Sequence, residues 1–172
     1  AKKLGFVYVD TGAMYRAMAL YFLRKGVDPK AVEEIEKSCP EVDVTIRYQD
    51  GLQQVLLNGE DVSGLIRTEE VGNMASAVSG YMPVREKLVE LQKQLAANEN
   101  VIMDGRDIGT CVLPDAPAKI YLTASVKVRA ARRYKELLEK GMKADLKEIE
   151  KDIEDRDYRD MHREHSPLKQ AE

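Results

Sequence analysis

The stretch Val101-Ile-Met-Asp-Gly-Arg-Asp-Ile-Gly-Thr110 decides the fold of this chain. Its first three residues are apolar and predict a short buried strand, which the Asp104-Gly105 pair ends. Directly behind the strand come a guanidinium, Arg106, and the carboxylates of Asp104 and Asp107. In an open α/β sheet, ligands bind beyond the carboxyl ends of the strands, so this cluster indicates a functional site. The alternative is a solvated surface turn with one Arg–Asp pair.

Strand and helix patterns alternate on both sides of this stretch. Residues 6–9 predict a strand that runs directly into a helix over residues 11–25, with Thr11 as its cap. Asp28 and Pro29 predict the N-cap and first position of a helix that ends near residue 37. Residues 119–123 predict a further strand. Strands that alternate with helices imply an α/β fold with a mainly parallel sheet.

A different pattern occupies residues 42–57. Residues 42–48 alternate with period two, residues 49–51 predict a turn, and residues 52–57 alternate again before Asn58-Gly59. We expect a small antiparallel insert of two or three strands here. Further helices are expected over residues 68–79, from Pro83 onward, over residues 125–141 and over residues 145–163.

The composition is that of one globular domain over residues 1–172. Hydrophobic residues make up 44% and charged residues 33% of the chain. The net charge of −3 does not support a nucleic-acid partner, and no apolar run reaches membrane-spanning length. Cys39 and Cys111 have no metal-binding or CxxC spacing, which predicts reduced thiols in a cytoplasmic protein. We expect a monomer.

Arginines are concentrated near predicted turns and helix ends. Arginine binds phosphate oxygens in a bidentate manner and stays charged at any working pH, so the set predicts a polyanionic small-molecule ligand. Alternatively, those within residues 128–133 and 156–163 are solvated helix faces paired with acids. Arg16 and Arg106 lie outside such charged runs. The set is Arg16, Arg85, Arg106, Arg129, Arg132, Arg133, Arg156, Arg159 and Arg163.

Six motifs occur together and in one order, and jointly they strongly resemble the bacterial-type cytidylate kinase family. These P-loop nucleoside monophosphate kinases phosphorylate CMP and dCMP with ATP, and the resemblance covers essentially the whole chain. The motifs are Asp-Thr-Gly-Ala-Met-Tyr-Arg (residues 10–16), Asn-Gly-Glu-Asp-Val-Ser (58–63), Ile-Arg-Thr-Glu-Glu-Val (66–71), Val-Arg-Glu (84–86), Asp-Gly-Arg-Asp-Ile-Gly-Thr (104–110) and Arg-Asp-Tyr-Arg-Asp (156–160).

The resemblance implies a P-loop kinase-like parallel sheet flanked by helices. It places the small antiparallel β insert in a monophosphate-binding region over residues 40–80, and a lid with its flanking helices over residues 125–165. It also implies ATP and Mg²⁺ as cofactors. In-line phosphoryl transfer depends on positioning and charge stabilisation, which suits a site rich in arginine.

The resemblance also implies a role for each matched residue. Arg16 and Arg106 would bind the acceptor phosphate, while Ser76, Arg85 and Asp107 would read the cytosine. Asp160 and Arg156 would contact the ribose, and Asp104 would hold Mg²⁺ through water. The implied substrate-binding set is Thr11, Tyr15, Arg16, Ser76, Arg85, Arg106, Asp107, Arg156 and Asp160. The implied catalytic set is Asp104, Arg106, Arg156, Arg159 and Arg163, with Arg129, Arg132 and Arg133 toward ATP.

One family motif is absent from the sequence. The loop Gly-x-x-x-x-Gly-Lys-[Ser/Thr], which cradles the ATP phosphates, does not occur. The chain opens where the resemblance places the end of the helix behind that loop, and it ends before the family's final strand and helix. We therefore expect either a fragment of a working kinase or a shortened chain that transfers phosphate poorly.

Two further functions are alternatives. One is a nucleotide-binding module without catalysis; the other is a related kinase for UMP, AMP or a small polyol, against which Asp107 and the insert argue. The missing loop also affects the sheet. The resemblance places the P-loop strand between residues 101–104 and residues 119–123, so we expect these segments not to be direct neighbours. Either a strand from outside this sequence fills that position, or the sheet is rearranged.

Overall fold

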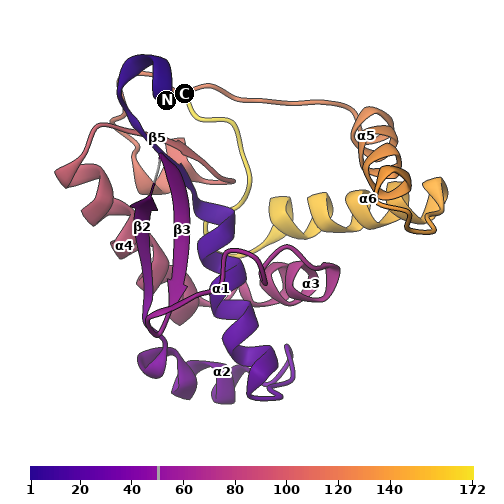
Figure 1. Ribbon diagram of the computed structural model, residues 1–172, viewed down its shortest axis with the longest axis horizontal. Coiled ribbons are helices and arrows are strands. Elements are labelled where there is room, and N and C mark those ends of the chain that lie inside the picture. Colours follow the sequence, from indigo (N-terminus) through magenta and orange to yellow (C-terminus); the bar gives the residue numbers. More distant parts are fainter. Residues whose placement is uncertain (50) are drawn as a thin grey trace.

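Helix α1 (Thr11–Arg24) lies at the centre of the structure, a computed structural model that describes residues 1–49 and 51–172. It packs against β3, α3 and α4, as Figure 1 shows. Met14, Met18 and Phe22 lie one turn apart on α1 and are fully buried. Ala13, Ala17 and Ala19 are buried as well, so the core surrounds most of this helix.

Two small sheets flank α1. β1 (Val7–Asp10) and β5 (Val101–Asp104) pair in parallel, with Asp10 opposite Asp104. β2 (Val44–Gln49), β3 (Leu52–Leu57) and the short β4 (Glu60–Asp61) form an antiparallel sheet, so the expected insert has three strands. The turn predicted at residues 49–51 includes residue 50, which lies outside the described residues.

The remaining helices follow the sequence pattern closely. Their bounds are α2 (Val32–Ser38), α3 (Glu69–Val78), α4 (Met82–Asn98), α5 (Val126–Glu139) and α6 (Leu146–His162), with short turns at Lys2–Leu4, Cys39–Glu41 and Ile108–Val112. Thr68, Ser125 and Asp145 cap α3, α5 and α6 through their side chains. Short polar side chains accept from the free N–H groups of a first turn, which is why these helix starts are predictable. Within the described residues, no helix is long and apolar enough to span a membrane.

Two predicted caps are wrong. The cap of α1 is Asp10, whose Oδ1 accepts from the Ala13 N–H at 3.1 Å, while the Thr11 hydroxyl donates to another strand. Asp28 does not cap α2. Its carboxylate accepts from the Lys30 N–H at 2.7 Å in a turn that precedes the helix, because aspartate readily binds the backbone two residues further on.

The strand predicted over residues 119–123 is also wrong. This segment forms neither helix nor strand, and Ile120 and Leu122 are 90% and 93% exposed. An extended apolar segment becomes a strand only when its backbone pairs with a neighbour. In the described part of the chain, β5 pairs with β1 alone, so residues 101–104 and 119–123 are indeed not neighbours.

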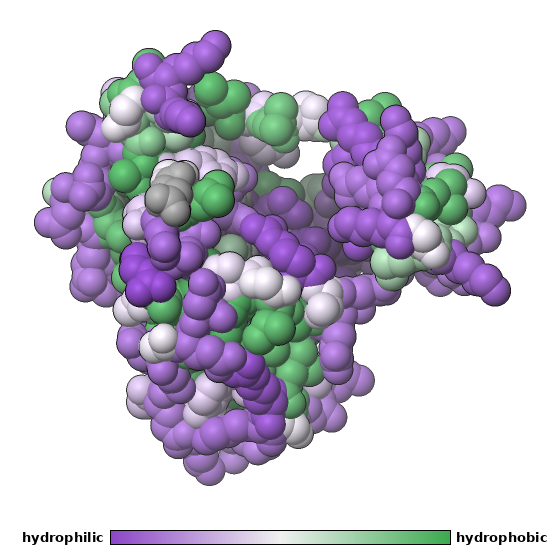
Figure 2. Space-filling model, in the orientation of Figure 1, coloured by the Kyte–Doolittle hydropathy of each residue, from purple (hydrophilic) through white to green (hydrophobic). Residues whose placement is uncertain are grey.

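Helices α5 and α6 form an arm that extends from the body of the molecule (Figure 1). They pack against each other, and the Arg129 guanidinium binds the Asp157 carboxylate through two hydrogen bonds of 3.0 and 2.5 Å. The surface of the arm is largely hydrophilic, and an open gap separates part of it from the body (Figure 2). The arm is therefore held together mainly by its own contacts.

Replacing Phe22 by alanine should destabilise the fold by ~3–5 kcal/mol, the usual effect of removing a buried aromatic ring. Phe22 is completely buried in α1, whereas Phe6 is 39% exposed. Urea unfolding followed by circular dichroism measures both variants, with Phe6→Ala as the matched control. A Phe22→Ala midpoint equal to that of Phe6→Ala would contradict the central role of α1.

Candidate functional site

The carboxyl ends of β1 and β5 meet at one point of the molecule. The Thr11 hydroxyl, at the start of α1, donates to the Asp104 carbonyl at 2.7 Å. A Cβ on Gly105 would lie 2.5 Å from the Thr11 Oγ1, so only glycine leaves room for this contact. The Tyr8 hydroxyl donates to the Asp104 carboxylate at 2.6 Å, and this hydrogen bond raises the pKa of Tyr8 to about 12. The predicted strand-end cluster is thus anchored to both strands.

Arg85 and Asp107 form a buried ion pair behind this junction. The Arg85 Nη2 donates to the Asp107 Oδ2, and both side chains are almost fully buried. The Arg85 Nη1 donates to the Ser79 carbonyl at 2.8 Å, which fixes the guanidinium in place. The guanidinium carbon also lies 5.7 Å from the centre of the Tyr15 ring. Buried charges persist when they are paired and hydrogen-bonded, so α4 and the loop after β5 are tied together here.

Asp160 is a second buried carboxylate, and three arginines surround it. The Arg106 Nε donates to its Oδ2 at 2.9 Å, although the two residues are 54 positions apart. The Arg163 Nη1 lies 3.7 Å from its Oδ1, and the Arg156 Nε lies 4.0 Å from its Oδ2. This cluster joins α6 to the loop after β5.

Arg16 lies one turn into α1, on the side that faces α3. Its Nη1 donates to the carbonyls of Ile66 and Thr68 at 2.9 and 3.2 Å. A Cβ on Gly72 would lie 3.0 Å from the Arg16 Nη2, so α3 approaches this guanidinium closely. Burial lowers the pKa of Arg16, and the positive charge of the neighbouring Arg67 lowers it further.

Positive charge exceeds negative charge in this region. Burial lowers the pKa values of Arg156 and Arg163, and the charges of Arg106 and Arg85 respectively add to the effect. Four arginines surround two buried aspartates, and the charge of Arg16 also lowers the pKa of Arg156, although the whole chain carries a net charge of −3. An anionic ligand would relieve this imbalance. The four are Arg85, Arg106, Arg156 and Arg163.

The same region holds most of the buried polar atoms that have no partner. Within the described residues, five buried side-chain atoms form no hydrogen bond, and four of them belong to residues of this cluster. Buried polar atoms are almost always satisfied in proteins, so such a concentration points to a polar ligand. The four are the Tyr15 hydroxyl, the Ser76 hydroxyl, the Arg85 Nε and the Arg163 Nη2; the fifth is the Gln92 Nε2.

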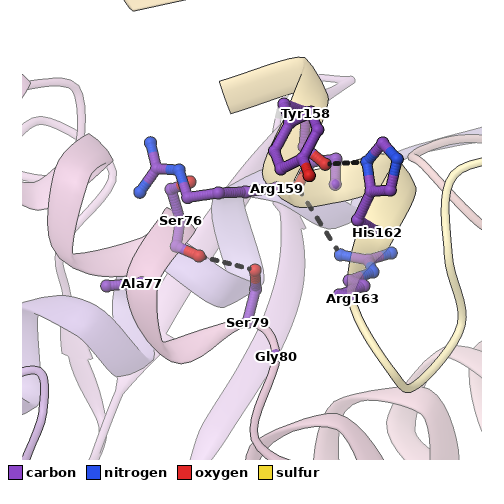
Figure 3. A pocket seen from close by; sticks show the side chains of 9 residues that line it. Ser76, Ala77, Ser79, Gly80, Tyr158, Arg159, His162 and Arg163 are labelled. Atoms are coloured by element: carbon purple, nitrogen blue, oxygen red, sulfur yellow. Dashed lines mark hydrogen bonds and ion pairs between the residues drawn. The ribbon is translucent and has the colours of Figure 1, made fainter. Parts of the chain in front are cut away.

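A pocket of about 360 Å³ opens beside these atoms, between the end of α3 and α6. Figure 3 shows Ser76 and Ser79 on one side of it and Arg163 on the other. The Tyr158 and His162 rings stack with their centres 4.0 Å apart at its edge. The lining consists of Ser76, Ala77, Ser79, Gly80, Tyr158, Arg159, Asp160, His162 and Arg163.

Most of the sequence-predicted site residues come together. Among the arginines of α5, Arg133 lies close enough for its charge to lower the pKa of Arg16, whereas Arg129 binds α6. Arg129 is bound to Asp157, Arg132 is exposed, and the Arg133 Nη1 lies 3.5 Å from the Glu136 carboxylate. Arg159 lines the pocket and donates to the Asp155 carbonyl at 3.3 Å. Sequence reasoning missed three residues that hold the site, namely Tyr8, Gln53 and Arg67. Tyr8 and Arg67 had usable signals, because Tyr8 lies two residues before the turn at Asp10 and Arg67 lies within the motif of residues 66–71.

Comparison with known proteins gives a uniform result. The family model described as "Cytidylate kinase" matches residues 1–172. A cytidylate kinase from Lactobacillus gasseri is 52% identical over 171 residues, which cover 99% of this chain and 74% of that protein. Cytidylate kinases from Caldicellulosiruptor saccharolyticus and Streptococcus gordonii are 50% and 49% identical over 172 and 173 residues, covering 100% of this chain and 76% and 77% of those proteins.

Tyr15 makes the stability of the site region sensitive to high pH. Burial of its phenol raises its pKa to about 12, against about 10 in the unfolded chain. The unfolded state therefore releases this proton first, and stability present below pH 10 should fall by ~2–3 kcal/mol as the pH rises to 12. The Tyr15→Phe variant should lack this part of the loss of stability. Urea unfolding between pH 8 and 12 gives the free energy of unfolding of both proteins. A Tyr15→Phe curve of free energy against pH that runs parallel to the wild-type curve would exclude this titration.

Proposed function

The chain belongs to the cytidylate kinase family, and on that premise we propose that its arginine cluster binds the acceptor nucleotide. The chain is an ATP-dependent nucleoside monophosphate kinase that converts CMP or dCMP into CDP or dCDP. The observation that supports the location is the coincidence of two features in one region. Unpartnered buried polar atoms and an excess of positive charge occur together there. A nucleoside monophosphate supplies both hydrogen-bonding groups and negative charge.

Arg16 and Arg106 are the proposed ligands of the acceptor phosphate. The Arg16 Nη1 is occupied by two carbonyls, which orients the guanidinium and directs the remaining donors elsewhere. Arg106 is half-exposed and held by Asp160, so its guanidinium is oriented yet accessible. Preorganised arginines bind phosphate without first losing side-chain freedom.

Cytosine recognition is proposed for Ser76, Arg85 and Asp107. The Ser76 hydroxyl and the Arg85 Nε are buried and have no hydrogen-bond partner, so each can form a hydrogen bond with one group of the base. Asp107 is held by Arg85 and can accept from the exocyclic amine of cytosine, where uracil has a carbonyl. A buried acceptor left unpaired by the wrong base discriminates strongly. Thr11 and Tyr15 support this region from the first turns of α1.

The ribose and the transferred group are assigned to α6. Asp160 is buried among three arginines and can accept from a ribose hydroxyl, with Arg156 beside it. Arg156, Arg159 and Arg163 would neutralise charge on the phosphoryl group during transfer. Because Arg129 is committed to Asp157, contact with ATP is proposed for Arg132 and Arg133.

Asp104 fits the proposed role of holding Mg²⁺ through water. Its carboxylate is exposed at the carboxyl end of β5, and Tyr8 orients it by donating to one oxygen. Carboxylate and water oxygens are the ligands that Mg²⁺ prefers. The ion would neutralise the charge that develops on the phosphates. We also propose a monomer, a cytoplasmic location and no nucleic-acid partner, on the basis of composition, net charge and cysteine usage.

The relatives named above are all called cytidylate kinase, so a module without catalysis or a kinase for another acceptor receives no support from them. ATP-dependent formation of CDP, followed by anion-exchange chromatography, tests the function directly. CMP and dCMP should be converted, and UMP only weakly. Conversion of none of these acceptors would contradict the proposal.

Asp107→Asn should reduce the preference for CMP over UMP by ~1–3 kcal/mol, or roughly 5- to 150-fold. The amide keeps the shape of the side chain but presents donors where cytosine presents its amine. Calorimetric titration with each nucleotide measures the preference. Asp115→Asn, at an exposed position, is the matched control. An unchanged preference in Asp107→Asn would remove this residue from base recognition.

Arg16→Lys should weaken the binding of CMP far more than the binding of cytidine, because only CMP carries the phosphate that the guanidinium is proposed to bind. Titration calorimetry with both ligands gives the two ratios. Arg24→Lys serves as the control, since Arg24 lies on the same helix and pairs with Glu60. Equal losses for CMP and cytidine would show that Arg16 does not contact the phosphate.

A further inference from the structure

Strand β1 has two edges, and they are covered in different ways. One edge pairs with β5 through backbone hydrogen bonds. The other edge meets two side chains of the β2–β3 hairpin, Tyr48 and Gln53, which we call the edge latch. The Tyr48 hydroxyl donates to the Tyr8 carbonyl at 3.0 Å, and Gln53 binds both backbone groups of Asp10. Within the described residues, the hairpin therefore contacts β1 without a backbone ladder between them.

The amide of Gln53 takes the place of a neighbouring peptide. Its Oε1 accepts from the Asp10 N–H at 2.8 Å, and its Nε2 donates to the Asp10 carbonyl at 3.3 Å. A primary amide carries a donor and an acceptor in the same plane, so it satisfies both groups of one residue at once. An aliphatic side chain provides neither contact.

The neighbouring glutamine has a different environment. Gln54 points to the opposite face of β3, because successive strand side chains alternate. Its Oε1 accepts from the Arg47 Nε at 3.0 Å, and its Nε2 donates to the Gln49 side chain at 3.2 Å. These contacts remain within the hairpin. Of the two adjacent glutamines, Gln53 contacts β1 and Gln54 contacts the hairpin.

Asp10 connects β1 to the helix and the side chains that form the site. Its carboxylate caps α1 at the Ala13 N–H and also accepts from the Arg67 Nη2 at 2.6 Å. The next residue, Thr11, holds the Asp104 carbonyl. Arg16 follows one turn later on α1. A shift of the Asp10 peptide would therefore move the beginning of α1, the Arg16 guanidinium and the end of β5 together.

We propose that Gln53 is a positioning residue for the kinase site, acting through the Asp10 peptide. By fixing both backbone groups of Asp10, its amide sets where α1 begins, and thereby positions Arg16 on α1 and Asp104 at the end of β5. The antiparallel insert, which does not line the site itself, thereby aligns the acceptor side of the site. This inference rests on the proposed location of the acceptor nucleotide, whereas the contact of Gln53 with Asp10 does not depend on it.

Gln53→Leu is the test, because leucine retains most of the side-chain volume and removes both hydrogen bonds. We expect kcat to fall about tenfold and the Kd for CMP to rise about tenfold, as the loss of two ordinary hydrogen bonds at one position would produce. Gln54→Leu, the matched control, should leave both constants as in the wild type.

Hydrogen exchange at the Asp10 amide, measured by NMR, provides a readout independent of catalysis. This amide should exchange faster in Gln53→Leu than in the wild type and at the wild-type rate in Gln54→Leu. Unchanged exchange, or unchanged kcat and CMP affinity in Gln53→Leu, would overturn the inference. A uniform rise in exchange across the core would also overturn it, because the role would then be merely structural. Wild-type protein that neither binds nor converts CMP would instead overturn the proposed function.

Discussion

The hydrogen bond from the Thr11 hydroxyl to the Asp104 carbonyl joins residues 93 positions apart, and the rest of the site depends on it. It sets the start of α1 against the end of β5, so two strand ends become one surface. Gly105 is required beside it, because any Cβ there would clash with the hydroxyl oxygen at 2.5 Å. This junction positions the central helix and Arg16, the proposed phosphate ligand on it.

Electrostatics explains why the site is built from pairs instead of isolated charges. Arg85 with Asp107, and Asp160 with its three arginines, are buried and mutually oriented. Such pairs contribute little net stability, because desolvation offsets their attraction. They do hold donors in fixed directions, and the positive excess that remains favours an anion. The function therefore depends on how these paired side chains are arranged more than on the strength of any single contact.

Helix α6 and the antiparallel insert approach the junction from different directions. α6 contributes Asp160 and its neighbouring arginines, and its partner helix α5 is fastened to it by Arg129 and Asp157. The insert contributes Gln53 and Tyr48, which cover the free edge of β1. Both elements are distant in sequence from β5, yet each contacts the groups that surround it. Movement of either element would therefore shift residues on the proposed acceptor side of the site.

Local sequence patterns determined the helices, an antiparallel insert of two or three strands and the strand-end cluster at residues 104–107, because caps, periodicity and turn residues act over a few positions. Tertiary structure alone decided the rest. Residues 119–123 have strand-forming side chains but no strand, since pairing depends on a neighbour that composition cannot supply. Asp10 caps α1 in place of the predicted Thr11, because the Thr11 hydroxyl donates to the Asp104 carbonyl of β5. The role of Gln53 was invisible for the same reason: hydrogen bonds between distant residues exist only once the chain has folded.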